Sequence, residues 1–221
     1  RDYYASRGLG DVYKRQISTY LDNMPLAAEL KADFEWAKSI AVGPGLSMNV
    51  AAAEITRCVL ERDDKVRILD ADALNIIAGE HIDYKGSREG QIIITPHIME
   101  MSRLTGKTVA DIKEHMIESA KEYAIQHSCI CILKDARTVV TDGQKVYINC
   151  TGNDGMSTGG CGDVLTGLIA GMTAMGLDAF EAACLSVYVH GKAGDYAASG
   201  KGRAGMTAAD VSEAIAYVLK R

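Results

Sequence analysis

Short apolar runs alternate along the chain with longer segments in which apolar residues recur every three to four positions. Four runs have the length and continuous hydrophobicity of buried strands: 38–43, 66–70, 91–95 and 129–134. Three intervening segments have the apolar spacing of helices that cover a core: 49–62, 71–79 and 109–127. This alternation predicts an α/β fold, with a parallel sheet covered by helices on both faces.

The pattern changes after residue 136. Two alternating runs flank Asp142 and Gly143, which predicts a β-hairpin that adds antiparallel strands to the sheet. The last third of the chain has helical spacing at 162–175, 179–198 and 207–219. No internal repeat or linker interrupts the pattern, so we expect one α/β domain.

The first sixteen residues lack a hydrophobic period and differ in composition from the rest of the chain. Their end, DVYKRQ at 11–16, resembles the translation of a transposon end that is used to tag DNA for sequencing. We therefore expect residues 1–16 to be an adaptor-like, disordered artefact, with a disordered native N-terminus as the alternative. The domain is assigned to residues 17–221.

Composition narrows the class of protein. The chain has 221 residues, of which 24 are basic and 29 acidic, and its net charge of −5 argues against nucleic acid as a partner. The longest apolar stretch, 164–177, is too short and too rich in glycine to span a bilayer. Six cysteines show no C-x-x-C pair, which is typical of buried thiols in a reducing compartment. These features predict a soluble cytoplasmic protein without a membrane partner.

The segment TGNDGMSTGGCGDVLTG, at 151–167, holds six glycines in seventeen residues. Three of them precede a predicted helix, where backbone N–H groups and the helix dipole can hold a phosphate. Asp163 follows them and could accept a proton from a hydroxyl that attacks this phosphate. The alternatives are a tight loop with a glycine cap, and an acidic residue that only stabilises the helix dipole.

Four more polar motifs follow the predicted parallel strands: GPGLS, DADALN, TPHIME and KDART. Ligands of parallel sheets bind outside the carboxyl ends of the strands, where these motifs would meet. Each motif alone could be an ordinary turn, because turns favour glycine, proline, aspartate and asparagine. Their convergence on one edge predicts a ligand site.

GGCGD before a helix is similar to the anion-hole and catalytic-aspartate motif of the ribokinase-like superfamily. Together with the four strand-end motifs and VYVHGKAGD, the chain from about residue 37 resembles the ADP-dependent NAD(P)H-hydrate dehydratases. This resemblance implies a ribokinase-like three-layer fold, with a mostly parallel sheet and helices on both faces. It also implies a hydro-lyase reaction. A nucleotide phosphorylates the C6 hydroxyl of (S)-NADHX or NADPHX, and loss of phosphate restores NADH or NADPH.

The resemblance also implies roles for particular residues. Asp163 would be the catalytic base, and the hydrate pocket would include Gly45, His97 and Asp163. Glu100 is the candidate Mg²⁺ ligand, with Asp72 and Asn75 near the phosphates. ADP or ATP would contact two motifs through Lys134, Asp135, Ala136, Arg137, Thr138, Gly159, Gly160 and Gly162.

Structural alternatives stay open for three of these residues. His97 could be a helix cap, Asp72 an N-cap, and Lys134 a solvated strand end. The chain also departs from the family pattern. Ile98 and Met99 replace a usual Pro-Gly, and Asp135 replaces a usual glycine, which adds a carboxylate that is unfavourable near phosphate unless it points away.

The resemblance further implies a homo-tetramer and a possible fusion to an NAD(P)HX epimerase domain. Family members have more strands, with their own Gly-rich loop, before the GPGL motif. We therefore expect the first strands to be missing here, and the 221-residue chain to be poorly soluble or inactive by itself. A ribokinase-like kinase of hydroxymethylpyrimidine type is the rival enzyme, and a non-catalytic nucleotide-binding protein is the rival of another class. DADALN and NDGMSTGG favour the dehydratase, and Asp163 favours catalysis.

Overall fold

The computed structural model describes residues 26–86 and 91–220, and the expected adaptor-like stretch lies outside them. Six strands of the described chain form one sheet in the order β1-β2-β3-β4-β5-β6. Four are parallel: β1 (Ser39–Val42), β2 (Val66–Leu69), β3 (Ile92–Ile94) and β4 (Ile130–Leu133). The hairpin strands β5 (Val139–Thr141) and β6 (Val146–Ile148) are antiparallel. The predicted strands and hairpin are confirmed.

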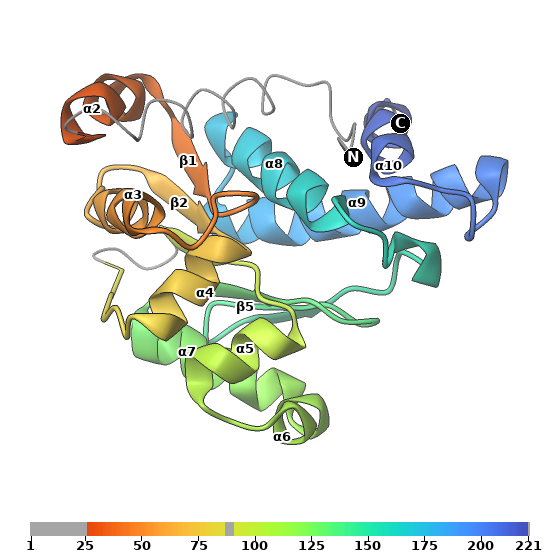
Figure 1. Ribbon diagram of the computed structural model, residues 1–221. Coiled ribbons are helices and arrows are strands. Elements are labelled where there is room, and N and C mark those ends of the chain that lie inside the picture. The colour runs from red at the N-terminus through yellow and green to blue at the C-terminus, as the bar shows by residue number, and fades with distance from the viewer. Residues whose placement is uncertain (1–25, 87–90, 221) are drawn as a thin grey trace.

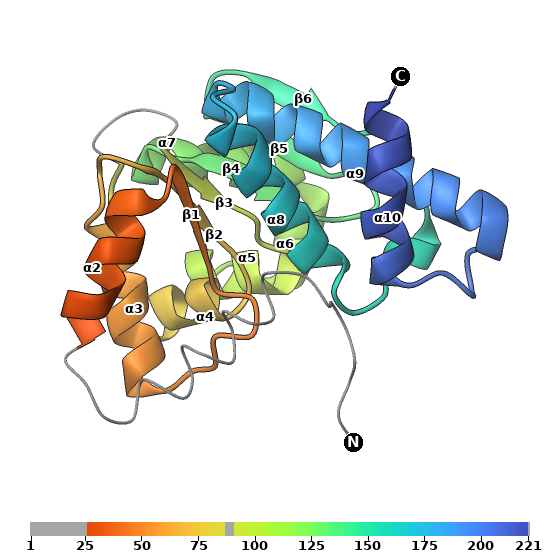
Figure 2. The ribbon, with the colours of Figure 1, turned by 90° about the horizontal axis from the view of Figure 1, so that it is seen from above.

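Helices cover both faces of this sheet, as Figures 1 and 2 show. One face carries α2 (Leu26–Trp36), α3 (Val50–Leu60), α4 (Asp72–Gly79), α5 (Ile98–Thr105), α6 (Val109–Glu114) and α7 (Met116–His127). The other carries α8 (Cys161–Ala174) and α9 (Ala179–Lys201), and α10 (Ala208–Leu219) packs on α9. A 3₁₀ turn, η1 (Asp154–Met156), precedes α8. The three-layer α/β architecture is confirmed.

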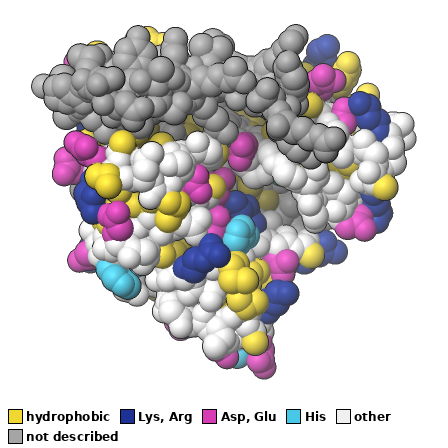
Figure 3. All heavy atoms as spheres, viewed as in Figure 1, with side chains coloured by type: hydrophobic (Ala, Val, Ile, Leu, Met, Phe, Trp, Pro, Cys, Tyr) yellow, Lys and Arg dark blue, Asp and Glu magenta, His cyan; other side chains and the backbone are white. Residues whose placement is uncertain are grey.

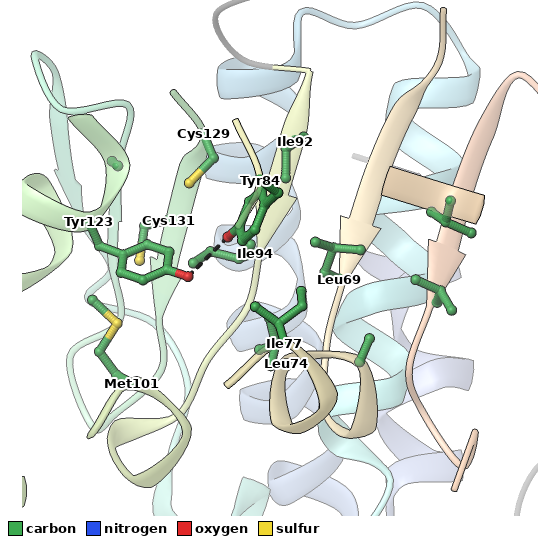
Figure 4. Packing of buried hydrophobic residues seen from close by; sticks show 14 of the residues in the cluster. Leu69, Leu74, Ile77, Tyr84, Ile92, Ile94, Met101, Tyr123, Cys129 and Cys131 are labelled. Carbon is green, nitrogen blue, oxygen red and sulfur yellow. Dashed lines mark hydrogen bonds between the residues drawn. The ribbon is translucent and has the colours of Figure 1, made fainter. Parts of the chain in front are cut away.

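Side chains alternate between the two cores along each parallel strand. On β3, Ile92 and Ile94 pack against the α2–α7 layer, and Ile93 packs against α8 and α9. All three are fully buried, as expected of a parallel strand with both faces covered. Figure 4 shows the larger core, where the hydroxyls of Tyr84 and Tyr123 lie 3.1 Å apart in a hydrogen bond. This packed core holds the strand ends in place.

Two helix predictions need correction. Residues 109–127 form two helices rather than one, because the backbone leaves the helical region at His115 (φ −127°, ψ 49°). Ile112 before the break and Ala120 after it both reach the core, so the apolar spacing continues across the break and hides it. Helix α5, which begins within the TPHIME motif, was not predicted, because a histidine rather than Ser, Thr, Asp or Asn caps it.

Charge and hydrophobicity are mixed on the surface. Figure 3 shows acidic, basic and apolar side chains interspersed over the face turned toward the viewer, without a basic stripe among its described residues. Within the described ranges, none of the helices has the length and apolar character that crossing a membrane requires.

Candidate active site

The ends of β1 and β2 are brought together by a glycine. At Gly43 (φ 125°) a Cβ would lie 1.7 Å from the carbonyl oxygen of Asp70, so only glycine fits. The N–H of Asp70 donates to the carbonyl of Val42 at 3.1 Å. The next residues turn back, and the N–H of Ser47 donates to Asp72 Oδ2 at 2.8 Å. Gly45 thus lies exposed in a loop fixed at the carboxyl edge of the sheet.

Asp72 is not an N-cap, which corrects one of the alternatives. The N-cap of α4 is Ala71, and it has an unusual backbone conformation (φ 48°, ψ −117°). A positive φ is uncommon for a residue with a Cβ and indicates local strain of the kind found near functional sites. Asp72 instead holds the loop that contains Gly45, so the DADALN motif shapes the edge between β1 and β2.

His97 caps α5, as its alternative interpretation proposed. Its Nδ1 accepts hydrogen bonds from the N–H groups of Met99 and Glu100, both at 3.1 Å. Glu100 returns the contact, because its Oε2 accepts from the N–H of His97 at 2.8 Å. The His97 side chain stays 50 % exposed, whereas that of Glu100 is 6 % exposed. His97 can therefore also face a ligand, and the role of Glu100 as a Mg²⁺ ligand stays a prediction.

Beside His97, the end of β4 carries Lys134. The two residues form a parallel bridge, and the N–H of Lys134 donates to the carbonyl of Pro96 at 2.8 Å. Its Nζ donates to Asp70 Oδ1 at 2.7 Å, and the Lys134 side chain is 21 % exposed against 2 % for Asp70. Lys134 is therefore one half of a partly buried ion pair, and its interpretation as a solvated strand end is wrong.

Asp70 is a site residue that sequence reasoning missed. Burial raises the pKa of its carboxyl, but the charge and hydrogen bond of Lys134, with the hydroxyls of Thr166 and Thr95, outweigh burial and hold the pKa below its usual value. Thr166 Oγ1 donates to Asp70 Oδ2 at 2.8 Å. One signal could have revealed the pair, because Asp70 and Lys134 are charged residues that end two of the predicted parallel strands.

The first turn of α8 lies over this ion pair. A Cβ on Gly162 would lie 3.6 Å from Lys134 Nζ and 3.7 Å from Asp70 Oδ2. The N-cap, Gly160, has a left-handed backbone (φ 91°), and no described side chain caps this helix end. Asp163 lies exposed in the same turn. The arrangement offers an anion the helix dipole, a nearby ammonium group and a close approach to the backbone.

Helix α9 holds the Gly-rich loop that leads to α8. Asp195 accepts hydrogen bonds from the N–H of Gly152 and the side chain of Asn153, both at 3.1 Å. Thr151 Oγ1 donates to the carbonyl of Tyr188 at 3.0 Å. A Cβ on Gly191 would lie 2.2 Å from Thr151 Oγ1, so loop and helix touch. These contacts explain the VYVHGKAGD motif, to which sequence reasoning assigned no role.

His190 of the same motif lies close to the first turn of α8. Its Nε2 is buried and has no hydrogen-bond partner within the described part of the chain. Burial lowers the pKa of His190 to about 4, with a further lowering from the charge of Lys134, although a hydrogen bond with the Cys161 backbone opposes it. The ring is therefore neutral at pH 7, and this histidine was also missed.

Other candidate residues are less closely tied to the ion pair. Asp135, Ala136 and Arg137 are exposed in the connection from β4 to β5, and Thr138 is partly buried. Thr138 Oγ1 donates to the carbonyl of Asp135 at 3.3 Å, which closes this turn. Gly159 is exposed in the loop before α8. These positions leave the nucleotide assignments as predictions.

The side chain of Asn75, on α4, contacts α5. Its Oδ1 accepts a hydrogen bond from Arg103 at 2.7 Å. Both residues, with Met48, line an open groove of about 420 Å³ between α4 and α5. This bond joins Asn75 to α5 rather than to Asp70 or Lys134, so its place near the phosphates also stays a prediction.

Comparison with known proteins identifies the family. The profile of the NAD(P)H-hydrate dehydratases matches residues 12–217. A bifunctional NAD(P)H-hydrate repair enzyme of Moorella thermoacetica is 45 % identical over 183 residues, covering 82 % of this chain and 34 % of that protein. The chain thus spans about a third of the length of this curated relative.

Two solved structures share the fold. The ADP/ATP-dependent NAD(P)H-hydrate dehydratase of Bacillus subtilis, co-crystallised with ATP and Mg²⁺, is 34 % identical with a TM-score of 0.75, covering 83 % of this chain and 66 % of that one. A ribokinase-like superfamily protein of Enterococcus faecalis is 27 % identical with a TM-score of 0.76, and the match covers 86 % of this chain and 66 % of that one. The fold is therefore ribokinase-like, and the chain belongs to the NAD(P)H-hydrate dehydratase family.

Proposed function

We propose that this chain catalyses the ADP- or ATP-dependent dehydration of (S)-NADHX and NADPHX to NADH and NADPH. The observation that carries the proposal is the first turn of α8, which contains Asp163, which no side chain of the described residues caps, and in which Gly162 lies close to Lys134 Nζ. An anion site beside a carboxylate is the arrangement that phosphoryl transfer to a hydroxyl needs. The family membership supports the substrate.

The reaction has two steps. The C6 hydroxyl oxygen of the hydrate attacks the terminal phosphorus of the nucleotide, and the bond from that phosphorus to the nucleotide oxygen breaks. Asp163 accepts the hydroxyl proton as this P–O bond forms. The C6–O bond then breaks, phosphate leaves, and loss of a proton from the ring restores the dihydronicotinamide. The nucleotide leaves one phosphate shorter.

The other site residues bind and orient the reactants. The first-turn backbone of α8 and the Lys134 ammonium hold the phosphoryl group while its charge shifts. Gly45 and His97 contact the hydrate, and residues 134–138 with 159–162 contact the nucleotide. Asp135 is exposed, so its carboxylate can point away from the phosphates.

Mg²⁺ fits this site as a partner of the nucleotide. The described residues contain no cluster of three or more side chains that could hold a metal ion. Mg²⁺ commonly needs one or two carboxylates together with substrate phosphates, and Asp72 and Glu100 are carboxylates at this edge. When bound, the ion neutralises charge on the phosphates in transfer.

The first prediction tests the proposal through Asp163. With ADP or ATP, Mg²⁺ and NADHX, we expect the wild-type protein to restore absorbance at 340 nm. Asp163→Asn should lower this turnover by about 10²–10⁴-fold, because the proton acceptor is lost, while nucleotide binding measured by calorimetry persists.

The control variant is Glu118→Gln. Glu118 is an exposed acidic residue in the third position of α7, as Asp163 is in α8, so both variants remove an acidic residue from a helix first turn. Glu118→Gln should keep wild-type turnover. Nucleotide consumption without recovery of absorbance would instead indicate a small-molecule kinase, and near-wild-type activity of Asp163→Asn would contradict the catalytic role.

We also infer that the protein works in the cytoplasm. All six cysteines are free thiols, and Cys150 is exposed, which suits a reducing compartment. The homo-tetramer and a partner epimerase domain, both implied by the family resemblance, stay predictions.

A further inference from the structure

We propose that Asp70 is a positioning residue, which holds the Lys134 ammonium in place for the phosphoryl group that passes beneath the first turn of α8. The proposal rests on the proposed function, because that function places the phosphoryl group at the N-terminal end of α8. It gives Asp70 a role through Lys134 and no contact with the reactants.

Both oxygens of the Asp70 carboxylate are used. Oδ1 accepts from Lys134 Nζ at 2.7 Å, and Oδ2 accepts from Thr166 Oγ1 at 2.8 Å. Lys134 directly follows β4, whereas Thr166 lies on α8, four residues after Gly162. Since residues four apart share one helix face, Thr166 and Gly162 face the ion pair together. Asp70 therefore joins β2, β4 and α8 at the base of the anion site.

The ion pair is asymmetric in exposure. Asp70 is 2 % exposed, whereas Lys134 is 21 % exposed, so the carboxylate forms the floor and the ammonium forms the surface. An ammonium group has three N–H donors. The hydrogen bond from Lys134 Nζ to Asp70 Oδ1 uses one of these donors. The remaining donors can reach an anion without giving up the pair.

A purely structural role would be an expensive choice for this position. Removing charges from water is strongly unfavourable, and well-packed apolar residues often replace a buried ion pair without loss of stability. A carboxylate at this position also repels phosphate. The pair is more readily explained by the fixed position of the ammonium group, since a misplacement of about 1 Å can slow a reaction by about 10²-fold.

The second prediction follows from this asymmetry. Asp70→Asn keeps the shape of the side chain but removes the charge that holds Lys134. We expect kcat to fall by about 10–100-fold, because the ammonium group is no longer fixed. The nucleotide Kd should stay equal or become tighter, because a negative charge near the phosphates is gone. A merely structural role predicts a lower Tm with kcat unchanged at a temperature where the variant is folded.

Asp64→Asn is the matched control. Asp64 precedes the other end of β2 and pairs with Arg62 at 2.9 Å on the surface, so its loss removes an ion pair far from the anion site. It should leave kcat unchanged. If Asp70→Asn does not fold, Thr166→Val is the second variant, since it removes the hydroxyl that orients the Asp70 carboxylate and so loosens the position of the Lys134 ammonium group. It should lower kcat by a few fold with an unchanged nucleotide Kd, and an unchanged kcat would overturn the proposal.

One measurement does not depend on dehydratase activity. In ¹⁵N NMR spectra of the full chain, an ammonium group held by Asp70 should give a slowly exchanging Lys134 signal, assigned by its absence in Lys134→Met. The signal should disappear in Asp70→Asn and persist in Asp64→Asn. If the wild type binds ADP and shows this signal but does not convert NADHX, the proposed function fails while the positioning of Lys134 stands. A signal that persists in Asp70→Asn, or wild-type kcat in that folded variant, would overturn the positioning role.

Discussion

At the scale of single residues, the site depends on side chains whose charge state is set by their surroundings. Asp70 keeps its negative charge in a buried position because Lys134 and Thr166 stabilise it. His190 is the opposite case, because burial favours its neutral form and its Nε2 has no partner among the described residues. A second cation close to Lys134 would disturb the pair, so a neutral ring at this position suits the anion site.

The third prediction concerns the pH dependence of stability through His190. Burial lowers its pKa to about 4 in the folded protein, whereas an unfolded histidine has a pKa of about 6.5. The unfolded chain therefore binds a proton that the folded chain refuses. The free energy of unfolding should be unaffected by this group above pH 6.5, and should decrease by up to about 3 kcal/mol as the pH falls toward 4.

Urea denaturation at pH 7.5, 5.5 and 4.5 measures this slope. His190→Gln removes the titrating group and should flatten the slope in this window. His115→Gln is the control, because it makes the same substitution at an exposed histidine. An equal slope in wild type and His190→Gln would show that another group is responsible.

At the scale of elements, α9 acts as the support of the Gly-rich loop. Asp195 binds Gly152 and Asn153, and the absence of a side chain at Gly191 lets Thr151 lie against the helix. The loop in turn leads into the first turn of α8. The geometry of the anion site therefore depends on a helix that contributes no residue to the proposed phosphoryl contacts.

The fourth prediction tests this support with two glycines of one helix. Gly191→Ala would place a Cβ 2.2 Å from Thr151 Oγ1 and 2.7 Å from the Thr151 backbone carbon, so the loop must shift. We expect a loss of about 1–3 kcal/mol in the free energy of unfolding and a lower kcat. Thermal or urea denaturation, with the 340 nm assay, measures both.

Gly200→Ala is the control in α9, because a Cβ there meets no atom within 4 Å. It should keep kcat and leave stability equal or higher by about 0.5 kcal/mol, as alanine is the better helix former. Equal behaviour of the two variants would contradict the supporting role of α9.

At the scale of the whole molecule, the proposed site exists only in the folded chain. It combines the ends of four parallel strands with the first turn of α8, and Asp70 and Lys134 are 64 positions apart. A ligand that binds this edge therefore binds the folded state alone and stabilises it by mass action.

The fifth prediction is that ADP with Mg²⁺ raises the Tm. At a concentration of 100 times Kd the gain is about 2.7 kcal/mol, which corresponds to about 5–10 °C for a chain of this size. Differential scanning fluorimetry measures the shift. Lys134→Met should lose most of it, whereas Lys201→Met, which breaks the surface pair with Asp210, should keep it. A full shift in Lys134→Met would remove Lys134 from the nucleotide site.

Local pattern was sufficient for the strands, the hairpin and the Gly-rich motif. Apolar runs, an Asp-Gly turn and glycines before a helix are features of neighbouring residues, and their physical causes act over a few positions. The same locality explains the errors. The break at His115 leaves the apolar spacing unchanged, and the histidine cap of α5 falls outside the usual N-cap residues.

Local sequence pattern could not predict which residues contact each other within the site. Asp70 meets Lys134 because the parallel register brings the ends of β2, β3 and β4 to one edge, and the cover of α8 then buries the pair. The neutral state of His190 likewise arises from packing between α9 and the start of α8. Burial and long-range contacts set these charges, and both come into being only when distant segments pack together.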